Sequence, residues 1–249
     1  QGRCALVTGG ASGIGRACAL ALADHGARVM VLDKDPSVLT VFNAPDIQGQ
    51  ICDVKDAQAV RDAVAESVAA LGGLDILVNN AGIFCASDQV ADMPEDEWQR
   101  SLDINLTGAM HVARESIPYL RLGWEPSVII VGSKNVPAPG PAAGAYSVAK
   151  AGLTQLARVL ALELAADGIR VNTVHPNAVF DTAIWTDEVL EGRAAHYGMS
   201  VEDYRSNNLL RQEVTSSDVA AMVCVMAGPA FRCTTGAQLP IDGGNERVV

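Results

Sequence analysis

The chain has 249 residues, a length that suits one large domain or two small ones. Its 29 acidic and 18 basic residues give a formal charge of −11, and such a surface repels phosphate backbones and anionic lipid heads. Binding to nucleic acids or to membrane surfaces is therefore disfavoured, and a chain that is 49% hydrophobic and 19% charged is too apolar to be disordered.

Short apolar runs alternate with helical patterns from one end of the chain to the other. Strands are predicted at residues 4–8, 28–32, 50–52, 74–78, 128–131, 169–174 and 237–241, most of them unalternating apolar runs typical of strands covered on both faces. Helices are predicted at residues 16–25, 57–71, 95–120, 145–166 and 217–228. This alternation predicts an α/β fold: a single doubly wound Rossmann-type domain over residues 1–249, with a seven-stranded parallel sheet and helices on both faces.

Residues 183–210 interrupt the alternation. Two short helical pieces stand there in place of a single crossover, and Ser200 has the pattern of a residue that caps a helix start. An insertion before the last strand, at the carboxyl end of a parallel sheet, is where a substrate lid would lie. The segment is therefore predicted to be a substrate lid or, equally well, a plain surface excursion.

A glycine-rich turn joins the first strand to the first helix, with the sequence Thr8-Gly9-Gly10-Ala11-Ser12-Gly13-Ile14-Gly15-Arg16. Glycines let the backbone turn tightly and approach a pyrophosphate, whose charge then meets the free N–H groups and positive dipole at the helix start. A Walker A phosphate loop is excluded, because the last glycine is followed by Arg16-Ala17 rather than by Lys and Ser or Thr. The spacing differs from G-x-G-x-x-G, but the position between strand and helix favours dinucleotide binding over an ordinary turn.

Asp33 closes the second strand, 20 residues beyond Gly13. A carboxylate at this position can accept hydrogen bonds from both hydroxyls of an adenosine ribose, and it would repel a 2′-phosphate, so it favours NAD over NADP. Lys34 follows directly and could weaken that preference. A solvated aspartate at a strand end is the alternative interpretation.

Three further side chains suggest acid–base chemistry. Tyr146 and Lys150 are four residues apart and share one helical face, so the ammonium can favour the phenolate of a phenol whose pKa is ordinarily about 10. The pair is a candidate general base, and Ser133, after the fifth strand, could hydrogen-bond the substrate oxygen as its charge changes. Taken singly, each residue also has an ordinary structural explanation as a boundary residue or a cap.

Together these residues resemble the short-chain dehydrogenase/reductase family over the whole chain. The matching residues, in that family's order, are Thr8-Gly9, Gly13-Ile14-Gly15, Asp33, Asp53-Val54, Asn79-Asn80-Ala81-Gly82, Asn105, Ser133 and Tyr146-Ser147-Val148-Ala149-Lys150. The resemblance implies an NAD(H)-dependent oxidoreductase whose catalytic residues are Asn105, Ser133, Tyr146 and Lys150. It further implies that Lys150 holds the nicotinamide ribose and that Asn105 keeps a water-linked proton path open. The implied cofactor contacts are Gly9, Ser12, Gly13, Ile14, Gly15, Asp33, Asp53, Val54, Asn80, Ala81, Gly82, Tyr146, Lys150, Pro176 and Val179.

Two stretches depart from the family's usual pattern. Lys134-Asn135 stands where many members carry a second small hydroxyl residue, and Pro176-Asn177 replaces the usual Pro-Gly after the sixth strand. Together with His175, these polar side chains could bind a small polyhydroxylated or carboxylated substrate, whereas a steroid or fatty-acyl site would show a more apolar lining. The alternative is that Lys134 points to water and that Asn177 occupies a left-handed turn, which Asn tolerates.

The same stretches and residues 183–210 resemble the dehydrogenase half of bifunctional rhamnulose-1-phosphate aldolase/alcohol (lactaldehyde) dehydrogenases. This resemblance implies a short hydroxyaldehyde substrate such as lactaldehyde. The hydrate of an aldehyde carries a hydroxyl on the reacting carbon, so it can be oxidised to an acid without a thiohemiacetal. Cys85 is the thiol best placed to suggest a nucleophile, and we expect no such role for it. Because residue 1 is Gln, we expect that an initiator and short leader, or a longer preceding polypeptide, are missing from the chain.

Other features concern location and assembly. No signal-peptide pattern opens the sequence, and the longest strongly apolar stretch, residues 219–231, is short of the ~18 residues that span a membrane, so we expect a cytoplasmic protein. Six scattered cysteines predict buried free thiols, and four histidines without metal-binding spacing predict no metal site. The helix at 145–166 is apolar on nearly every face, which predicts a homo-oligomer, dimer or tetramer, or else cover by a neighbouring segment of the same chain.

The expected partner is a small-molecule substrate rather than a nucleic acid or a membrane. Two other functions remain open at this point: a nucleotide-binding regulatory or scaffold protein of the same fold, and an NADP-dependent carbonyl reductase. An intact set of Ser133, Tyr146 and Lys150 argues against the first, because a sensor has no physical need to retain it.

Overall fold

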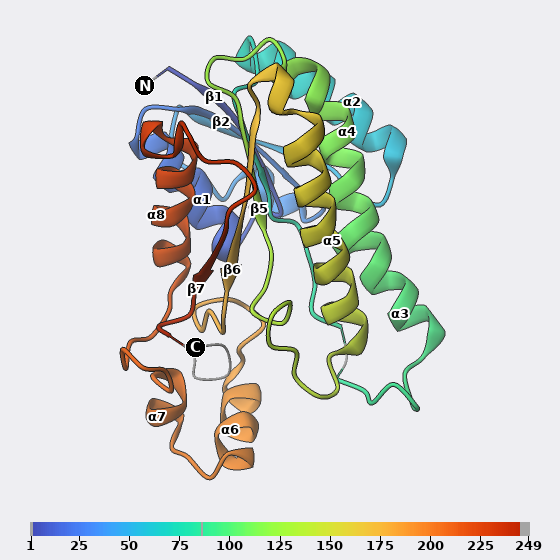
Figure 1. Cartoon of the computed structure of the whole chain (residues 1–249), viewed down its shortest axis with the longest axis vertical. Coiled ribbons are helices and arrows are strands. Elements are labelled where there is room, and N and C mark those ends of the chain that lie inside the picture. Colours follow the sequence, from blue (N-terminus) through green and yellow to red (C-terminus); the bar gives the residue numbers. More distant parts are fainter. Residues whose placement is uncertain (1, 86, 245–249) are drawn as a thin grey trace.

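The computed structural model describes residues 2–85 and 87–244. At its centre lies a seven-stranded parallel sheet in the order β3-β2-β1-β4-β5-β6-β7. The strands are β1 (Cys4–Thr8), β2 (Arg28–Asp33), β3 (Ile47–Ile51), β4 (Ile76–Asn79), β5 (Ser127–Val131), β6 (Arg170–Pro176) and β7 (Gln238–Ile241). Helices cover both faces of the sheet, so the predicted doubly wound fold is confirmed (Figure 1).

Two layers of helices divide the core. The helices α1 (Gly13–Asp24) and α8 (Ser216–Ala227) cover one face, and α2 (Ala57–Leu71), α4 (Ala109–Leu120) and α5 (Gly144–Glu163) cover the other (Figure 1). Successive side chains of a strand point to opposite faces of the sheet. Leu6 of β1 therefore packs on the side of α2, α4 and α5, whereas Val7 packs on the side of α1 and α8, and both are fully buried. Because both faces are covered, the strands read as continuous apolar runs. Three short 3-10 turns complete the core region, η1 (Pro36–Leu39), η3 (Ala165–Asp167) and η4 (Pro229–Phe231).

The third strand lies earlier than predicted, at Ile47–Ile51 rather than 50–52. It is one of the two edge strands of the sheet, and its pairing with β2 begins at Val29 opposite Ile47. The three residues between Ile47 and Ile51 are glutamine or glycine. A side chain at Gly49 would overlap the Val38 carbonyl oxygen of η1. The sequence pattern placed the strand three residues too late because the cover of its first residues is a close local contact rather than a broad apolar layer.

The single helix predicted at 95–120 is divided into two helices. It consists of α3 (Glu95–Leu102), a π-helical turn η2 (Asp103–Gly108) and α4. A side chain at Gly108 would lie only 2.6 Å from Val54 Cγ2, so the wider turn lies tightly against the loop after β3. Periodicity cannot reveal such an insertion, because the apolar spacing continues across it.

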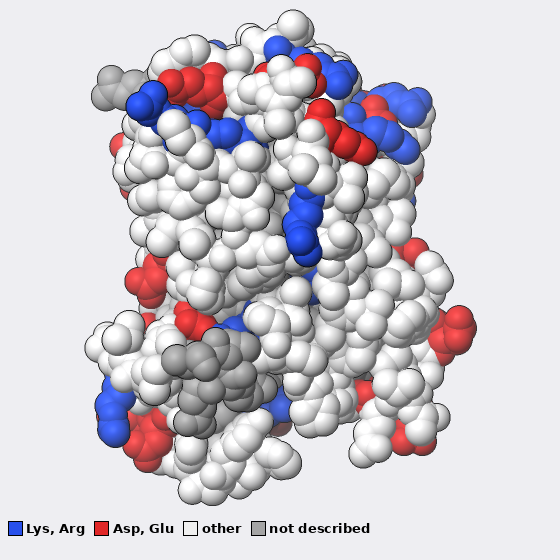
Figure 2. Space-filling model, viewed as in Figure 1, with Lys and Arg blue, Asp and Glu red and all other residues white. Residues whose placement is uncertain are grey.

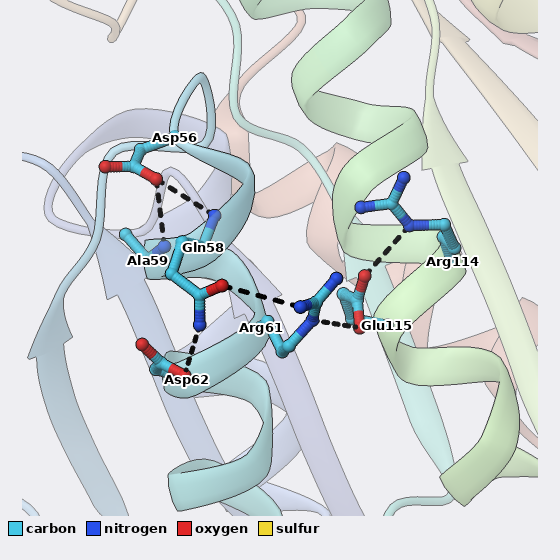
Figure 3. A network of polar contacts seen from close by, with 7 residues as sticks. All are labelled: Asp56, Gln58, Ala59, Arg61, Asp62, Arg114 and Glu115. Atoms are coloured by element: carbon cyan, nitrogen blue, oxygen red, sulfur yellow. Dashed lines mark hydrogen bonds and ion pairs between the residues drawn. The ribbon is translucent and has the colours of Figure 1, made fainter.

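Polar contacts tie α2 to α4 on the outer surface (Figure 3). Asp56 caps α2 by accepting the N–H groups of Gln58 and Ala59. Arg61 of α2 lies 3.5 Å from Glu115 of α4, whose carboxylate also accepts a 2.8 Å hydrogen bond from Arg114. These surface contacts link α2 to α4, but exposed ion pairs contribute little to the stability of the fold.

Residues 183–210 form a separate projection beyond the carboxyl end of the sheet (Figure 1). It contains α6 (Asp187–His196) and α7 (Val201–Arg205), and Ser200 caps α7 as predicted, accepting the Asp203 N–H. An aromatic cluster holds it to the loop after β6. The ring of Phe180 lies 4.8 Å from that of Trp185 and 5.8 Å from that of Tyr204.

One face of α5 lies outside the core. Val148, Val159 and Leu162 are exposed, Leu162 to 81%, whereas Leu153 and Leu160 are buried against the sheet. In Figure 2, charged side chains are few across the middle of the molecule, although one Lys or Arg side chain lies where α5 runs in Figure 1. Among the described residues, therefore, the outer face of α5 has no complete cover from the chain itself.

Within the described ranges, no helix is long and apolar enough to cross a membrane. The prediction of buried thiols is right for Cys4, Cys18, Cys52 and Cys85, whereas Cys224 is half-buried and Cys233 is exposed. Cys233 follows the short turn η4 near the surface, where no layer of structure covers it.

Candidate active site

The chain reverses its winding direction at β1, which lies between β2 and β4. Ligands of open α/β sheets bind at such a switch point, outside the carboxyl ends of the strands. The loops after β1 and β4 meet here. Thr8 Oγ1 accepts the N–H groups of Asn80 and Ala81 at 3.0 and 3.1 Å, and Asn80 Nδ2 donates to the carbonyl oxygens of Thr8 and Gly9 at 2.9 Å.

The glycine-rich turn has the shape that a phosphate cradle needs. Gly9 and Gly13 have φ angles of +66° and +52°, and a side chain at Gly9 would lie 2.6 Å from Ala81 Cα. Ser12 precedes α1 in an extended conformation, and its side chain makes no capping hydrogen bond in the described structure. The first-turn N–H groups of α1 are thus left to an anion, and the pyrophosphate of a dinucleotide fits this geometry.

Asp33 lies beside this turn. Its carboxylate accepts the Ala11 N–H at 2.9 Å with one oxygen and the Asp35 N–H at 2.9 Å with the other. Two further predicted cofactor contacts, Asp53 and Val54, lie in the loop after β3. The Asp53 carboxylate accepts the Lys55 N–H, and the Val54 side chain is buried. The structure therefore brings the β1 turn and Asp33 together, and their role at the adenosine end of a cofactor stays a prediction.

A second group of polar side chains lies where β5 ends and α5 begins. Lys150 is buried and donates from Nζ to the Val131 carbonyl oxygen at 2.9 Å. The same Nζ lies 5.9 Å from the centre of the Tyr146 ring, and the Tyr146 hydroxyl hydrogen-bonds the Ser133 side chain. The Asn135 N–H donates to Ser133 Oγ at 3.1 Å. Three of the four residues predicted to be catalytic, Ser133, Tyr146 and Lys150, are therefore neighbours in space.

The π-helical turn brings Asn105 to the same place. Asn105 is fully buried, and it accepts the Ile83 N–H at 2.9 Å and donates to the Ile83 carbonyl oxygen at 3.1 Å. A side chain at Gly82 would lie 2.7 Å from Asn105 Oδ1 and 3.4 Å from Lys150 Nζ. Gly82 thus allows the loop after β4 to pass between these two polar groups.

Burial changes the pKa values of this group. Desolvation raises the pKa of Tyr146 above its ordinary value, and its hydrogen bond to Ser133 opposes this only in part. Burial also lowers the pKa of Lys150 to about 8. The sequence predicted a lysine that lowers the pKa of the phenol. In the structure, burial instead raises the pKa of Tyr146, so the phenol carries its proton at neutral pH.

His175, expected near the substrate, instead supports Ser133. It is buried in β6, and its Nδ1 lies 3.1 Å from the Ser133 nitrogen and 3.0 Å from the Ser133 carbonyl oxygen. Its Nε2 lies 3.2 Å from Gln238 Oε1. Burial lowers the pKa of His175, against the opposing hydrogen bonds to Gln238 and Ser133. A neutral ring of β6 thus links the loop after β5 to β7.

Lys134 does not point to water. Its side chain is only 2% exposed, and its ammonium forms an ion pair with Asp242, which follows β7. Asn177 is not in a left-handed turn, because its φ is not positive. Its N–H donates to the Ile241 carbonyl oxygen at 3.0 Å, which extends the pairing of β6 with β7.

Pro176, Val179 and Cys85 complete the comparison with the predicted site. Pro176 ends β6, and Val179 is buried in the loop that follows. Cys85 is buried, and burial raises the pKa of its thiol, so the residue is a poor nucleophile, as expected. Across residues 2–85 and 87–244, no cluster of three His, Cys, Asp or Glu side chains could hold a metal ion.

The sequence did not reveal Asp242 or the role of His175. The partners Lys134 and Asp242 are 108 residues apart, and His175 and Ser133 are 42 apart. In the sequence the only signal was a lysine, Lys134, beside the predicted catalytic Ser133. That this lysine is buried, and therefore requires a partner, is seen only in the structure.

The chain matches a family model described as enoyl-(acyl carrier protein) reductase over residues 9–246. It is 34% identical to a 2-dehydro-3-deoxy-L-rhamnonate dehydrogenase (NAD(+)) of a Sphingomonas strain, over 98% of this chain and 95% of that protein. It is 30% identical to a short chain dehydrogenase/reductase, astE, of Aspergillus oryzae, over 98% and 95% of the two chains. It is 36% identical to the uncharacterized oxidoreductase YuxG of Bacillus subtilis, over 96% of this chain but only 37% of that longer protein.

Solved structures agree with the fold. The 3-ketoacyl-(acyl-carrier-protein) reductase of Brucella melitensis, complexed with NADH, superposes with a TM-score of 0.88 at 26% identity, over 100% of this chain and 99% of that one. The aldohexose dehydrogenase of Thermoplasma acidophilum superposes with a TM-score of 0.86 at 26% identity, over 98% of this chain and 94% of that one. With the geometry above, these matches make the chain a member of the short-chain dehydrogenase/reductase family, an oxidoreductase family that uses nicotinamide cofactors.

Proposed function

We propose that this protein is an NAD-dependent dehydrogenase that transfers hydride between nicotinamide and a small polar alcohol or hydroxyaldehyde. The observation that supports this most strongly is the contiguity of Ser133, Tyr146 and Lys150 beside Gly82, at the carboxyl end of β5. No metal or covalent intermediate is required for such a transfer. Asn105 completes the proposed set from the π-helical turn.

In this proposal Tyr146 moves the proton. For oxidation, Tyr146 first releases its own proton to water. Its phenolate oxygen then accepts the hydroxyl proton of the substrate while a hydride leaves the carbinol carbon, so that a carbonyl remains. The bound cofactor supplies the hydride acceptor at nicotinamide C4. Ser133 donates a hydrogen bond to the substrate oxygen, and Lys150, when protonated, stabilises the phenolate that alternates with the neutral phenol.

The preference for NAD rests on Asp33. Its carboxylate lies beside the turn that fits the pyrophosphate, where the adenosine ribose would follow. A 2′-phosphate there would meet a negative charge. The Sphingomonas relative carries NAD(+) in its name, and the Brucella structure was determined with NADH, which supports the same assignment.

The substrate class follows from the polar groups near Ser133. Lys134 is paired with Asp242, so the ammonium that could have received a substrate carboxylate is neutralised. This favours an uncharged alcohol or hydroxyaldehyde over a sugar acid. Because Cys85 is buried and protonated, an aldehyde would be oxidised as its hydrate, and lactaldehyde is the specific substrate that we propose.

The test is turnover with a defined panel. The purified protein is mixed with NAD or NADP and with lactaldehyde, sugar alcohols or 2-hydroxy acids, while the absorbance of the reduced cofactor is followed. We expect faster turnover with NAD than with NADP, and faster turnover with uncharged substrates than with acids. Tight NAD binding without any turnover would contradict the proposal and support a regulatory nucleotide-binding protein.

The Tyr146→Phe substitution tests the acid–base role. It removes the proton carrier but keeps the ring, so we expect turnover to fall by ~10²- to 10⁴-fold or more while NAD binding is retained. Tyr119→Phe is the matched control, because Tyr119 lies on α4 and packs against the core away from Ser133. Equal activity of the Tyr146→Phe protein and the wild type would rule out the assignment.

A further inference from the structure

The buried pair of Lys134 and Asp242 has no role in the proton transfer described above. Lys134 directly follows Ser133, and Asp242 directly follows β7. Both side chains are almost completely buried, 2% and 8% exposed. Two charges taken out of water cost more than their attraction returns unless geometry and further hydrogen bonds compensate, so stability alone is a weak reason for such a pair.

On one side, the backbone of Lys134 is tied to the catalytic loop. Its N–H donates to the Pro176 carbonyl oxygen at 2.9 Å, and its own carbonyl accepts the Ala138 N–H at 3.0 Å. The neighbouring residue, Ser133, is held by His175. The ammonium of Lys134 is therefore attached to a stretch of backbone that cannot shift without displacing Ser133.

On the other side, Asp242 is tied to the end of the lid, residues 183–210. One carboxylate oxygen faces Lys134, and the other accepts the Gly244 N–H at 2.9 Å. The carbonyl oxygens of Gly244 and Gly243 then accept the N–H groups of Leu209 and Leu210 at 3.0 and 2.9 Å. The last two residues of the lid thus depend on the turn that Asp242 orders.

We infer that Lys134 and Asp242 are positioning residues that set the distance between Ser133 and the carboxyl-terminal end of the lid. The chain of contacts runs from Ser133 through Lys134, Asp242 and Gly244 to Leu209. Since a substrate of the proposed reaction would lie between Ser133 and the lid, the ion pair controls how closely the substrate is enclosed. The effect on substrate rests on the proposed function, whereas the mechanical link does not.

The decisive variant is the double substitution Lys134→Met with Asp242→Asn. Each single substitution leaves one buried charge unpaired and is expected to destabilise the protein. The double variant removes both charges, and Asn retains an oxygen that can accept the Gly244 N–H. It therefore tests the link between the two residues in a folded protein. The matched control is Arg121→Met with Asp167→Asn, which removes an exposed ion pair of 2.8 Å at the far end of α4.

Two measurements report the result. In steady-state kinetics, we expect the KM for the alcohol to rise roughly tenfold in the double variant, with kcat changed less than ~3-fold and the KM for NAD unchanged, because enclosure rather than chemistry is impaired. In hydrogen exchange without substrate, we expect the Leu209 and Leu210 amides to exchange roughly tenfold faster, while those of α6 stay as in the wild type. The control variant should match the wild type in both.

Each outcome decides between the link and a purely structural pair. Wild-type KM and wild-type exchange in the folded double variant would overturn the inference, since the pair would then only contribute stability. Loss of function in the single variants with full recovery in the double variant would overturn it for the same reason. Faster exchange of Leu209 and Leu210 in a protein that oxidises no alcohol would support the link while refuting the proposed function.

Discussion

At the scale of single residues, burial changes what a familiar pair of side chains can do. Spacing places Tyr146 and Lys150 on one face of α5, but it gives no information on their solvation. In the folded protein Lys150 has lost most contact with water and donates to the Val131 carbonyl oxygen. Its pKa of about 8 lies close to the range in which the enzyme would work, whereas the raised pKa of Tyr146 keeps the phenol protonated.

These two pKa values predict a pH profile for carbonyl reduction. Lys150 bears its positive charge below pH 8 and loses it above, while Tyr146 remains a proton donor throughout that range. We expect kcat/KM for NADH to be level between about pH 6 and 7.5 and to fall about tenfold per unit well above pH 8, since this parameter reports the free enzyme. Initial rates of NADH oxidation across the range measure it.

Lys150→Met should lower kcat/KM at every pH and remove the decline above pH 8. Arg158→Met alters an exposed cation on the same helix and should leave the profile unchanged. A decline that persists in the Lys150→Met protein would show that another group titrates.

At the scale of elements, close backbone contacts decide the shape of the site. The turn before α1 and the loop after β4 touch where a single Cβ has no room: a side chain at Gly15 would overlap the Gly9 carbonyl oxygen and lie 2.6 Å from Asn80 Nδ2. The π-helical turn before α4 is a second example, since it directs Asn105 to the backbone of Ile83. Apart from Gly15, no local sequence pattern predicts either of these two contacts.

The Gly15→Ala substitution should therefore damage both stability and cofactor binding. We expect a loss of about 1–3 kcal/mol in the free energy of unfolding, as for other overpacked sites, with weaker NAD binding because the cradle must shift. Denaturant unfolding and a cofactor titration measure the two effects.

Gly192→Ala is the matched substitution in α6, where the added methyl group would meet no described atom within 4 Å apart from its chain neighbours and the backbone of its own helix. For Gly192→Ala we expect the free energy of unfolding to increase by up to about 1 kcal/mol, since alanine is a better helix former than glycine. Equal stability of the two variants would contradict the close approach of the β1 and β4 loops.

At the scale of the whole molecule, the projection formed by residues 183–210 and the outer face of α5 lie outside the core. Residues 183–210 are held by aromatic contacts of Trp185 and Tyr204 with Phe180, and their last residues are held by hydrogen bonds to the turn after β7. Leu162 and Val159 of α5 are exposed on a face that the described residues leave uncovered. We propose that a second copy of the chain covers this face, as the apolar character of the helix predicts.

Leu162→Glu tests that proposal. A charge in the centre of a buried apolar contact, and the loss of the leucine, should weaken self-association by about 3 kcal/mol, or ~100-fold in Kd. Light scattering at micromolar concentration measures the change. Leu122→Glu, at an 87% exposed site after α4, should leave the oligomeric state as it is. A wild-type protein that is monomeric under these conditions would contradict the proposal.

The sequence alone determined the order of strands and helices, the parallel sheet, the glycine-rich turn and the spacing of Tyr146 and Lys150. These features are local: apolar periodicity, residues with special backbone freedom and a separation of one helical turn can all be read within short windows. The shift of β3 and the π-helical turn escaped prediction because a tertiary contact, with Val38 and with Val54, sets each of them.

Only the tertiary structure decided which polar side chains are available to a ligand. Lys134 and His175 had been expected to face the substrate, but partners far along the chain engage them, Asp242 and the Ser133 backbone. Burial and pairing of a charge depend on everything that packs around it, and the low dielectric of the interior then sets its pKa and its partners. No spacing along a single segment carries that information.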